Sequence, residues 1–346
     1  MLPPAEAPSI VDVHAHVIVG EVEAVVHDHP GLAAQRALDA RRNGAASQAV
    51  SRQMVLAAMP QLTGLDRRLA DMDAAGVDGQ LLSVSPSQYH YYAEPDLART
   101  VCRVANHGVA AVVAEEPGRL SGLGLVPLQH PALCVEALEH ALELGLRGVE
   151  ISSHAPGPEG STVELSDAGL EPFWAAAAEA GALVFLHPFG CSLDERLDRF
   201  YLANTVGQPV ENAVALSHLI FSGVLDRHPE LRILAAHGGG YLPTYLGRSD
   251  HAWTVRPEAR ECAEPPSSYL RRMWFDSLVH SPAALRALVD AVGVDRVLLG
   301  SDYPFDMGVT DPVERVRAAL DDPEPVLRGN AAHLGLVPHL TRGDSR

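Results

Sequence analysis

The sequence is poor in cysteine and in positive charge, and it lacks long hydrophobic runs. Its four cysteines, Cys102, Cys134, Cys191 and Cys262, form no Cys-x-x-Cys pair, which argues against a disulfide framework and favours reduced thiols in a cytoplasmic protein. Lysine and arginine number 26 against 44 aspartates and glutamates, a net charge of -18, and no basic run occurs, so we expect no nucleic-acid partner.

No apolar stretch approaches the roughly 18 residues that a transmembrane helix needs, so we expect no membrane span. The first residues contain neither the basic segment nor the apolar segment of a signal peptide, so we expect no secretion signal. Hydrophobic residues nevertheless make up 47% of the 346 positions, enough to bury a large core.

Short apolar runs alternate with longer helical patterns along the chain. The predicted strands cover residues 10–16, 77–84, 120–126, 148–152, 183–187, 231–237, 273–277 and 297–302. The predicted helices cover residues 65–75, 96–114, 130–144, 170–180, 210–226, 241–253, 282–291 and 313–320, with a final turn at 330–334. Strands that alternate with helices in this way are typical of a parallel sheet.

Eight such units favour a single (β/α)8 TIM barrel over residues 1–346, with the tail after residue 336 exposed to solvent. The alternative is an open, doubly wound sheet, but no Gly-x-Gly-x-x-Gly turn follows the first strand. Residues 17–65 are too many for a simple strand-to-helix connection, so we expect an insertion after strand 1 that lies over one end of the fold.

Polar side chains gather where the predicted strands end. His14 and His16 end the first strand, and alternate residues of a strand point to the same side. The other members of this set are His187, His237 and Asp302, at the ends of strands five, six and eight. A single strand-end histidine is often only a hydrogen-bonded rim residue, but five such residues at the catalytic end of one barrel favour a metal site. Three imidazoles and a carboxylate suit zinc, with iron, cobalt or manganese as alternatives.

Several motifs together resemble the amidohydrolase superfamily. They include Asp12-Val13-His14-Ala15-His16, His237-Gly238-Gly239-Gly240 and Gly300-Ser301-Asp302-Tyr303-Pro304-Phe305. Within that superfamily the sequence is similar to the branch of 2-amino-3-carboxymuconate-6-semialdehyde decarboxylase and related aromatic-acid decarboxylases. The matching motifs run from residue 12 to residue 305 in the family's order, and the histidine-triglycine and Gly-Ser-Asp-Tyr-Pro-Phe stretches are the specific ones.

The resemblance implies roles for individual residues. The metal ligands of the family, usually of zinc, match His14, His16, His187 and Asp302. His237 matches the general acid/base, so His237 and Asp302 are the expected catalytic residues. Arg248 matches an arginine that reaches across a dimer interface to a substrate carboxylate, which implies a homodimer. Residues 148–152 lack the lysine of the dinuclear branches, which favours one metal.

Other positions leave the substrate open. The decarboxylase carries a second arginine in its insertion, whereas Arg52 here is four positions away from the matching place. The loop Tyr89-His90-Tyr91-Tyr92 either lines a pocket or is an ordinary packed loop. Glu150 and Asp276, at the ends of strands four and seven, are expected to accept hydrogen bonds behind the site.

Three functions remain. The first is a metal-dependent decarboxylase of a small unsaturated or aromatic carboxylic acid, in which His237 protonates the carbon that loses carbon dioxide. The second is a hydrolase or hydratase of a lactone, amide or enol acid on the same scaffold, because a metal-bound hydroxide serves both reactions. The third is a barrel whose metal is structural. His237 argues against this function, because it stands at the same end of the barrel but is not one of the four expected ligands, whereas structural zinc sites are closed by four protein ligands.

Overall fold

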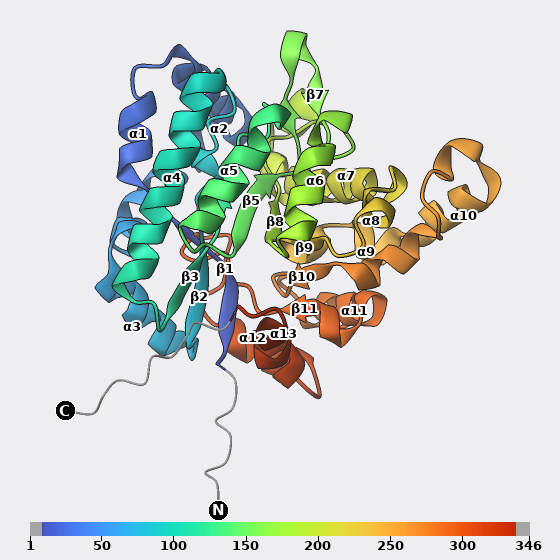
Figure 1. Ribbon diagram of the computed structural model, residues 1–346. Helices are drawn as coiled ribbons and strands as arrows, with labels where there is room; N and C mark the ends of the chain where they lie inside the picture. The colour runs from blue at the N-terminus through green and yellow to red at the C-terminus, as the bar shows by residue number, and fades with distance from the viewer. Residues whose placement is uncertain (1–8, 337–346) are drawn as a thin grey trace, which may run out of the picture.

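The computed structural model describes residues 9–336, so the predicted exposed tail lies outside the described residues. Parallel strands form its core and helices cover the outside (Figure 1). The strands of the core are β1 (Val11–Val17), β2 (Gly79–Val84), β3 (Leu120–Gly122), β4 (Gly124–Leu125), β5 (Gly148–Ser152), β8 (Leu183–His187), β9 (Arg232–Ala235), β10 (Trp274–Asp276) and β11 (Val297–Leu298).

The strands pair in the order β1-β2-β3 and β4-β5-β8-β9-β10-β11, all in parallel. Between the two groups the chain runs directly from β3 to β4, and Leu123 N donates to Leu82 O of β2 at 2.8 Å. On the other side, Val13 N of β1 donates to Leu299 O at 2.8 Å, and His16 N donates to Tyr303 O at 2.8 Å. These bonds join the segment that follows the last strand to the first strand, as expected for the predicted (β/α)8 barrel.

The outer helices bury one face each because their apolar residues recur at helical spacing. In α4 (Pro95–Glu115), for example, Val101, Ala105 and Val109 are all buried. The other outer helices are α5 (Pro131–Glu143), α6 (Glu171–Glu179), α7 (Gln208–Phe221), α8 (Val224–Arg227), α11 (Pro282–Val292), α12 (Pro312–Ala319) and α13 (Asn330–His333).

The predicted insertion after strand 1 is helical. It consists of α1 (Gly20–Val26) and α2 (Pro30–Thr63), which breaks at Gly44, where φ is +77°. The third helix, α3 (Leu65–Ala75), returns the chain to β2. Arg42 of α2 donates to the carbonyl of Cys191 at 3.2 Å, in the segment that follows β8. The insertion therefore lies at the C-terminal end of the strands, as Figure 1 shows for α1 and α2.

Several boundaries differ from the predicted ones. The predicted helix 210–226 is split between α7 and α8, because Gly223 adopts a left-handed conformation with φ +71°. The predicted helix 241–253 is split into α9 (Leu242–Tyr245) and α10 (Gly247–Val255), and α10 projects from the body of the protein (Figure 1). The short antiparallel pair β6 (Ala155–Pro156) and β7 (Thr162–Val163) was not predicted.

The third and eighth strands are shorter than expected. Residues 120–126 form the two short strands β3 and β4, interrupted at Leu123, and β11 ends at Leu298 instead of residue 302. Residues 299–303 still hydrogen bond to β1, so their side chains stay at the end of the barrel.

Candidate metal centre and active site

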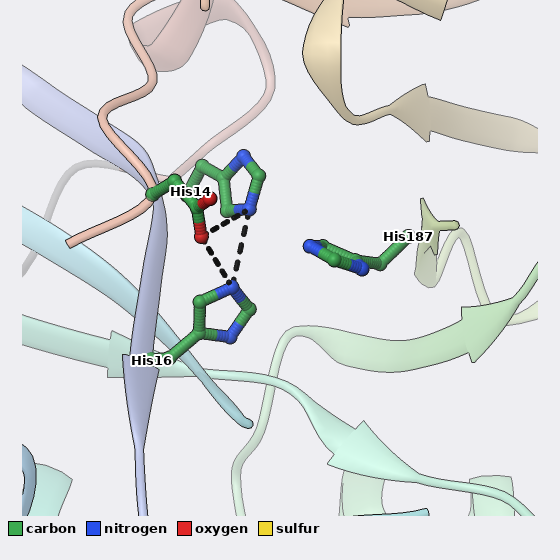
Figure 2. A group of neighbouring side chains, drawn as sticks. His14, His16 and His187 are labelled. Atoms are coloured by element: carbon green, nitrogen blue, oxygen red, sulfur yellow. Dashed lines mark hydrogen bonds and ion pairs between the residues drawn. The ribbon is translucent and has the colours of Figure 1, made fainter. Parts of the chain in front are cut away.

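The first strand presents two histidines to one point. His14 and His16 of β1 are fully buried, and their Nε2 atoms lie 3.2 Å apart. His187, at the end of β8, faces them from the opposite side of the barrel (Figure 2). The ring centroids of His14 and His16 each lie 5.1 to 5.2 Å from the ring centroid of His187. The structure thus brings together three imidazoles that are distant in the sequence.

The outer nitrogens of these rings fix how the rings are protonated. His14 Nδ1 lies 2.6 Å from Asp276 Oδ2, His16 Nδ1 lies 3.1 Å from the carbonyl of Val84, and His187 Nδ1 lies 2.9 Å from the carbonyl of Pro188. Carbonyl and carboxylate oxygens only accept, so each Nδ1 carries the hydrogen and each Nε2 presents a lone pair. His187 Nε2 is buried and has no hydrogen-bond partner among the described residues. Converging lone pairs of this kind suit a cation.

Asp302 completes the group. Its Oδ1 lies 3.2 Å from His16 Nε2 and 3.5 Å from His14 Nε2, and it is also buried. The ligand atoms of His14, His16, His187 and Asp302 all lie within 4.8 Å of one another. Ligands roughly 2 Å from a tetrahedral ion lie about 3 to 4 Å apart, so this group of four side chains can hold one metal ion.

The charge states of Asp302 and His187 suit metal binding. Burial raises the pKa of Asp302, but the neighbouring histidines lower it further, so the net pKa lies well below its usual range. Burial, together with the surrounding histidines, holds the pKa of His187 well below its usual range. The carboxylate is therefore ionised and His187 neutral, which are the forms that bind a metal.

His237 lies beside this group at the end of β9. Its Nε2 is 3.6 Å from Asp302 Oδ2, the other oxygen of that carboxylate. Burial lowers the pKa of His237, but the hydrogen bond to Asp302 and its charge raise it more, so the net shift is upward. The turn after His237 requires glycine at Gly240, where φ is +66° and a Cβ would lie 2.2 Å from the carbonyl oxygen of Pro209.

A cavity of about 420 Å³ opens in front of His237 and Asp302. Apolar side chains, among them Leu278, Leu288 and Met307, form much of its wall. Its polar lining comes from the segments that follow β8, β9 and β10, namely Asn204, Thr205, Gln208, Tyr241, Thr244 and His280. No arginine or lysine is among the described residues that line it. An acid bound in this cavity would therefore meet histidines and neutral hydrogen-bond donors of the chain. It would meet no permanently charged arginine or lysine.

The other residues singled out in the sequence lie away from this cavity. Arg248 is exposed on α10 and Arg52 is exposed on α2, and neither lines the cavity. In the tyrosine loop, Tyr89 and Tyr91 are buried with their rings 5.2 Å apart, and Tyr91 Oη accepts from Ser152 N at 3.3 Å. This loop is a packed one and does not line the cavity.

Carboxylates support the centre from behind. Asp276 accepts from His14 Nδ1 and also from Gly238 N at 2.9 Å, so one side chain positions both the first strand and the turn after His237. Asp12 accepts from Ser301 Oγ at 2.6 Å and from Gln80 Nε2 at 3.2 Å, and burial raises its pKa to about 6. Sequence reasoning gave Asp12 no role, although its spacing from His14 and His16 already placed all three on one side of the strand.

Comparisons with known proteins agree with this geometry. The family model described as Amidohydrolase matches residues 11–334. The 2-amino-3-carboxymuconate-6-semialdehyde decarboxylase of Dictyostelium discoideum is 36% identical over 79% of this chain and 77% of its own length.

Solved structures of decarboxylases are also similar to this chain. The crystal structure of 5-carboxyvanillate decarboxylase from Sphingomonas paucimobilis is 27% identical, covers 96% of this chain and 100% of that one, and has a TM-score of 0.79. A dihydroxybenzoic acid decarboxylase from Polaromonas sp. JS666, solved with bound manganese, has the same TM-score of 0.79 at 22% identity and covers 94% of this chain and 96% of that one. At 22% identity, the similarity to this second structure shows a shared fold only.

Proposed function

Because the chain belongs to the amidohydrolase family, we propose that it is a metal-dependent decarboxylase of a small unsaturated or aromatic carboxylic acid. The observation that carries the proposal is that the Nε2 atoms of His14, His16 and His187 and a carboxylate oxygen of Asp302 gather around one point, within 4.8 Å of one another. The names of the similar proteins support decarboxylation over the hydrolase or hydratase alternative.

We propose zinc as the metal, held by His14, His16, His187 and Asp302. Nitrogen ligands with one carboxylate are typical of zinc, and manganese, iron or cobalt also accept this set. When bound, such an ion polarises an oxygen of the substrate or lowers the pKa of a water to about 7. No lysine is present on β5, which supports a single ion.

His237 supplies the proton in this proposal. Its Nε2 lies 3.6 Å from Asp302 Oδ2, and the charge of Asp302 shifts the pKa of His237 upward, which favours its role as a proton donor. As the bond from the substrate carbon to its carboxylate breaks and carbon dioxide leaves, the electron pair stays on that carbon. The carbon then takes the proton from His237, which lines the cavity beside Asp302.

The shape of the site argues against a purely structural metal. A structural centre is closed on all sides, whereas His237 and Asp302 both line a cavity large enough for a small acid. The substrate acid would enter through this cavity, with its reacting carbon between His237 and the metal ligands.

Mass-resolved product analysis tests the reaction. We expect the zinc-loaded protein, given a panel of aromatic and muconate-type acids, lactones and enol acids, to release carbon dioxide with a loss of about 44 mass units, one carbon dioxide per turnover. A gain of about 18 mass units, one water, would establish the hydrolase or hydratase instead. The same panel with the His237→Ala variant serves as the control for contaminating activity.

The remaining assignments belong to the same proposal. We place the whole chain, 1–346, in one domain and the protein in the cytoplasm, where its four buried, unpaired cysteines stay reduced. No helix in the part of the chain that the structure describes is long and apolar enough to cross a bilayer. Arg248 is exposed and does not line its own cavity, and we propose that it serves the substrate site of a second copy in a homodimer.

A further inference from the structure

His237 has an unusual backbone conformation for a residue with a side chain. Its φ is +52°, and the three glycines that follow continue in the same region, with φ of +59° at Gly238, +72° at Gly239 and +66° at Gly240. Glycine adopts this left-handed region freely, whereas in any other residue the Cβ atom crowds the backbone there. Contacts from the rest of the fold must therefore hold His237 in this conformation.

The two peptide groups on either side of His237 are each bound by a buried side chain from another element. On the C-terminal side, Gly238 N donates to Asp276 Oδ1 at 2.9 Å. On the N-terminal side, Asn212 Nδ2 of α7 donates to the carbonyl oxygen of Ala236 at 2.8 Å. Because peptide groups are planar, φ and ψ of His237 are set by how these two groups are oriented relative to each other. Asn212 and Asp276 together fix both orientations.

The Ala236 carbonyl has a second partner besides Asn212, because Gly239 N also donates to it at 3.0 Å. Gly239 belongs to the turn itself and moves with it, whereas Asn212 ties the same oxygen to α7. Further along the turn, Gly240 packs against the carbonyl of Pro209, which lies on the same helix. Helix α7 thus supports the turn at two points, and Asn212 supplies the hydrogen bond.

The stability of the core does not explain why this residue of α7 is an asparagine. Asn212 is fully buried. Since the Ala236 carbonyl only accepts, the amide nitrogen of Asn212 must face it, which turns Oδ1 away. This Oδ1 is buried and has no hydrogen-bond partner among the described residues. A leucine of similar size would leave no buried side-chain atom unpaired, so the role of Asn212 lies in the hydrogen bond itself.

We propose that Asn212 is a positioning residue for His237, a role that rests on the proton donation assigned to His237 in the proposed function. With Asp276, it holds the backbone of His237 so that the ring stays in the cavity, with its Nε2 3.6 Å from Asp302 Oδ2. Asn212 is not among the described residues that line the cavity, so it acts through His237 alone.

Steady-state kinetics on the reaction that the wild-type protein catalyses test this role. We expect Asn212→Leu to lower kcat about ten- to a hundredfold, because a small displacement of a catalytic group is enough for such a loss. KM and zinc content should keep their wild-type values, since Asn212 is neither a lining residue of the cavity nor a member of the metal group. A wild-type kcat in Asn212→Leu would overturn the proposal.

Two further variants separate positioning from general damage to the fold. In a His237→Ala background no imidazole is left to position, so adding Asn212→Leu should lower the residual kcat no further. Asn330→Leu is the matched control, because Asn330 is also buried and its Nδ2 donates to the carbonyl of Val297, at the start of β11, at 2.7 Å. This control lies at the opposite end of the barrel and should lose stability but keep kcat. Equal losses of kcat in both asparagine variants, or additive losses in the double variant, would contradict the role.

Crystal structures of the wild-type and Asn212→Leu proteins give a readout that does not depend on the reaction. We expect the His237 ring of the variant to be displaced from Asp302, and a ring in the wild-type position would overturn the proposal whatever the kinetics show. If Asn212→Leu fails to fold, Asn212→Asp replaces it with the same expectations, since at pH 8 its carboxylate has a similar size but donates no hydrogen bond. A wild-type protein that releases no carbon dioxide contradicts the proposed function alone, because the structures still test the positioning.

Discussion

The floor of the active site and its mouth are built in different ways. The floor consists of strand ends: His14, His16 and His187 are buried, and each is held through its Nδ1 by an acceptor at 2.6 to 3.1 Å. The mouth consists of residues that follow the strands, in short helices and turns, from which Asn204, Thr244 and His280 line the cavity. In the proposed function the buried floor sets the chemistry, and the side chains of the mouth select the acid.

The two regions also differ in charge. Asp12, Asp276, Glu150 and Asp302 are all buried in or behind the floor. The cavity in front has Asp302 as its only carboxylate and no arginine or lysine among its described lining residues. Under the proposed function, the charge of the substrate acid is therefore balanced by the metal ion or by a second copy of the chain. Variants that act on one region alone can test this division.

The largest effect is expected from the floor. His14→Ala should weaken zinc binding by more than about 100-fold, because loss of a ligand costs more than loss of a group behind a ligand. Metal content after dialysis, measured by atomic emission, checks this. One full equivalent of zinc held at wild-type affinity would remove His14 from the metal centre.

The next effect separates proton transfer from metal binding. His237→Ala should keep its zinc and lower kcat by about 10² to 10⁴-fold, the usual contribution of a general acid. His280→Ala is the matched control, since His280 lines the same cavity but contributes no atom to the metal group. Steady-state kinetics on the two purified variants make the comparison, and equal losses in both would contradict the role given to His237.

A third variant tests the mouth across two copies of the chain. Arg248→Ala should raise KM roughly ten- to a hundredfold with little change in metal content, because in the proposed dimer Arg248 donates a charge-assisted hydrogen bond to the substrate carboxylate. Sedimentation velocity on the wild-type protein should show a dimer. A fully active monomer would contradict the assignment of Arg248 to a second copy.

The smallest effect concerns the floor without its metal. Because the pKa of Glu150 is raised to about 7, the folded protein keeps a proton that the unfolded chain releases at lower pH. The free energy of unfolding of the metal-free protein should therefore fall as the pH rises from about 4.5 to 7, by up to about 3 kcal/mol. Glu150→Gln should lack this decrease, and urea unfolding at pH 5 and pH 8 measures it. Parallel pH dependence in both proteins would place the raised pKa elsewhere.

Sequence reasoning predicted the strands more reliably where apolar runs are long and bounded. Residues 148–152 and 183–187 match β5 and β8 at both ends. It failed where a single residue changes the backbone direction, as at Gly223 and at Leu123, because periodicity averages over several residues. The hairpin of β6 and β7 was missed because two strands of two residues carry no detectable pattern.

The candidate site, too, was predicted from the sequence only in part. The amino-acid sequence alone determined which side chains stand at the ends of the strands, because alternation along a strand and the common direction of parallel strands follow from local geometry. That sufficed to name His14, His16, His187, His237 and Asp302 as one group.

Only the tertiary structure decided what surrounds that group. It placed Asp276 against His14, left the oxygens of Glu150 without partners and kept Arg248 out of its own cavity. These facts depend on how elements far apart in the sequence pack in three dimensions. Local sequence patterns do not encode such contacts, because each one is set by distances between strands, helices and connections that meet only in the folded chain.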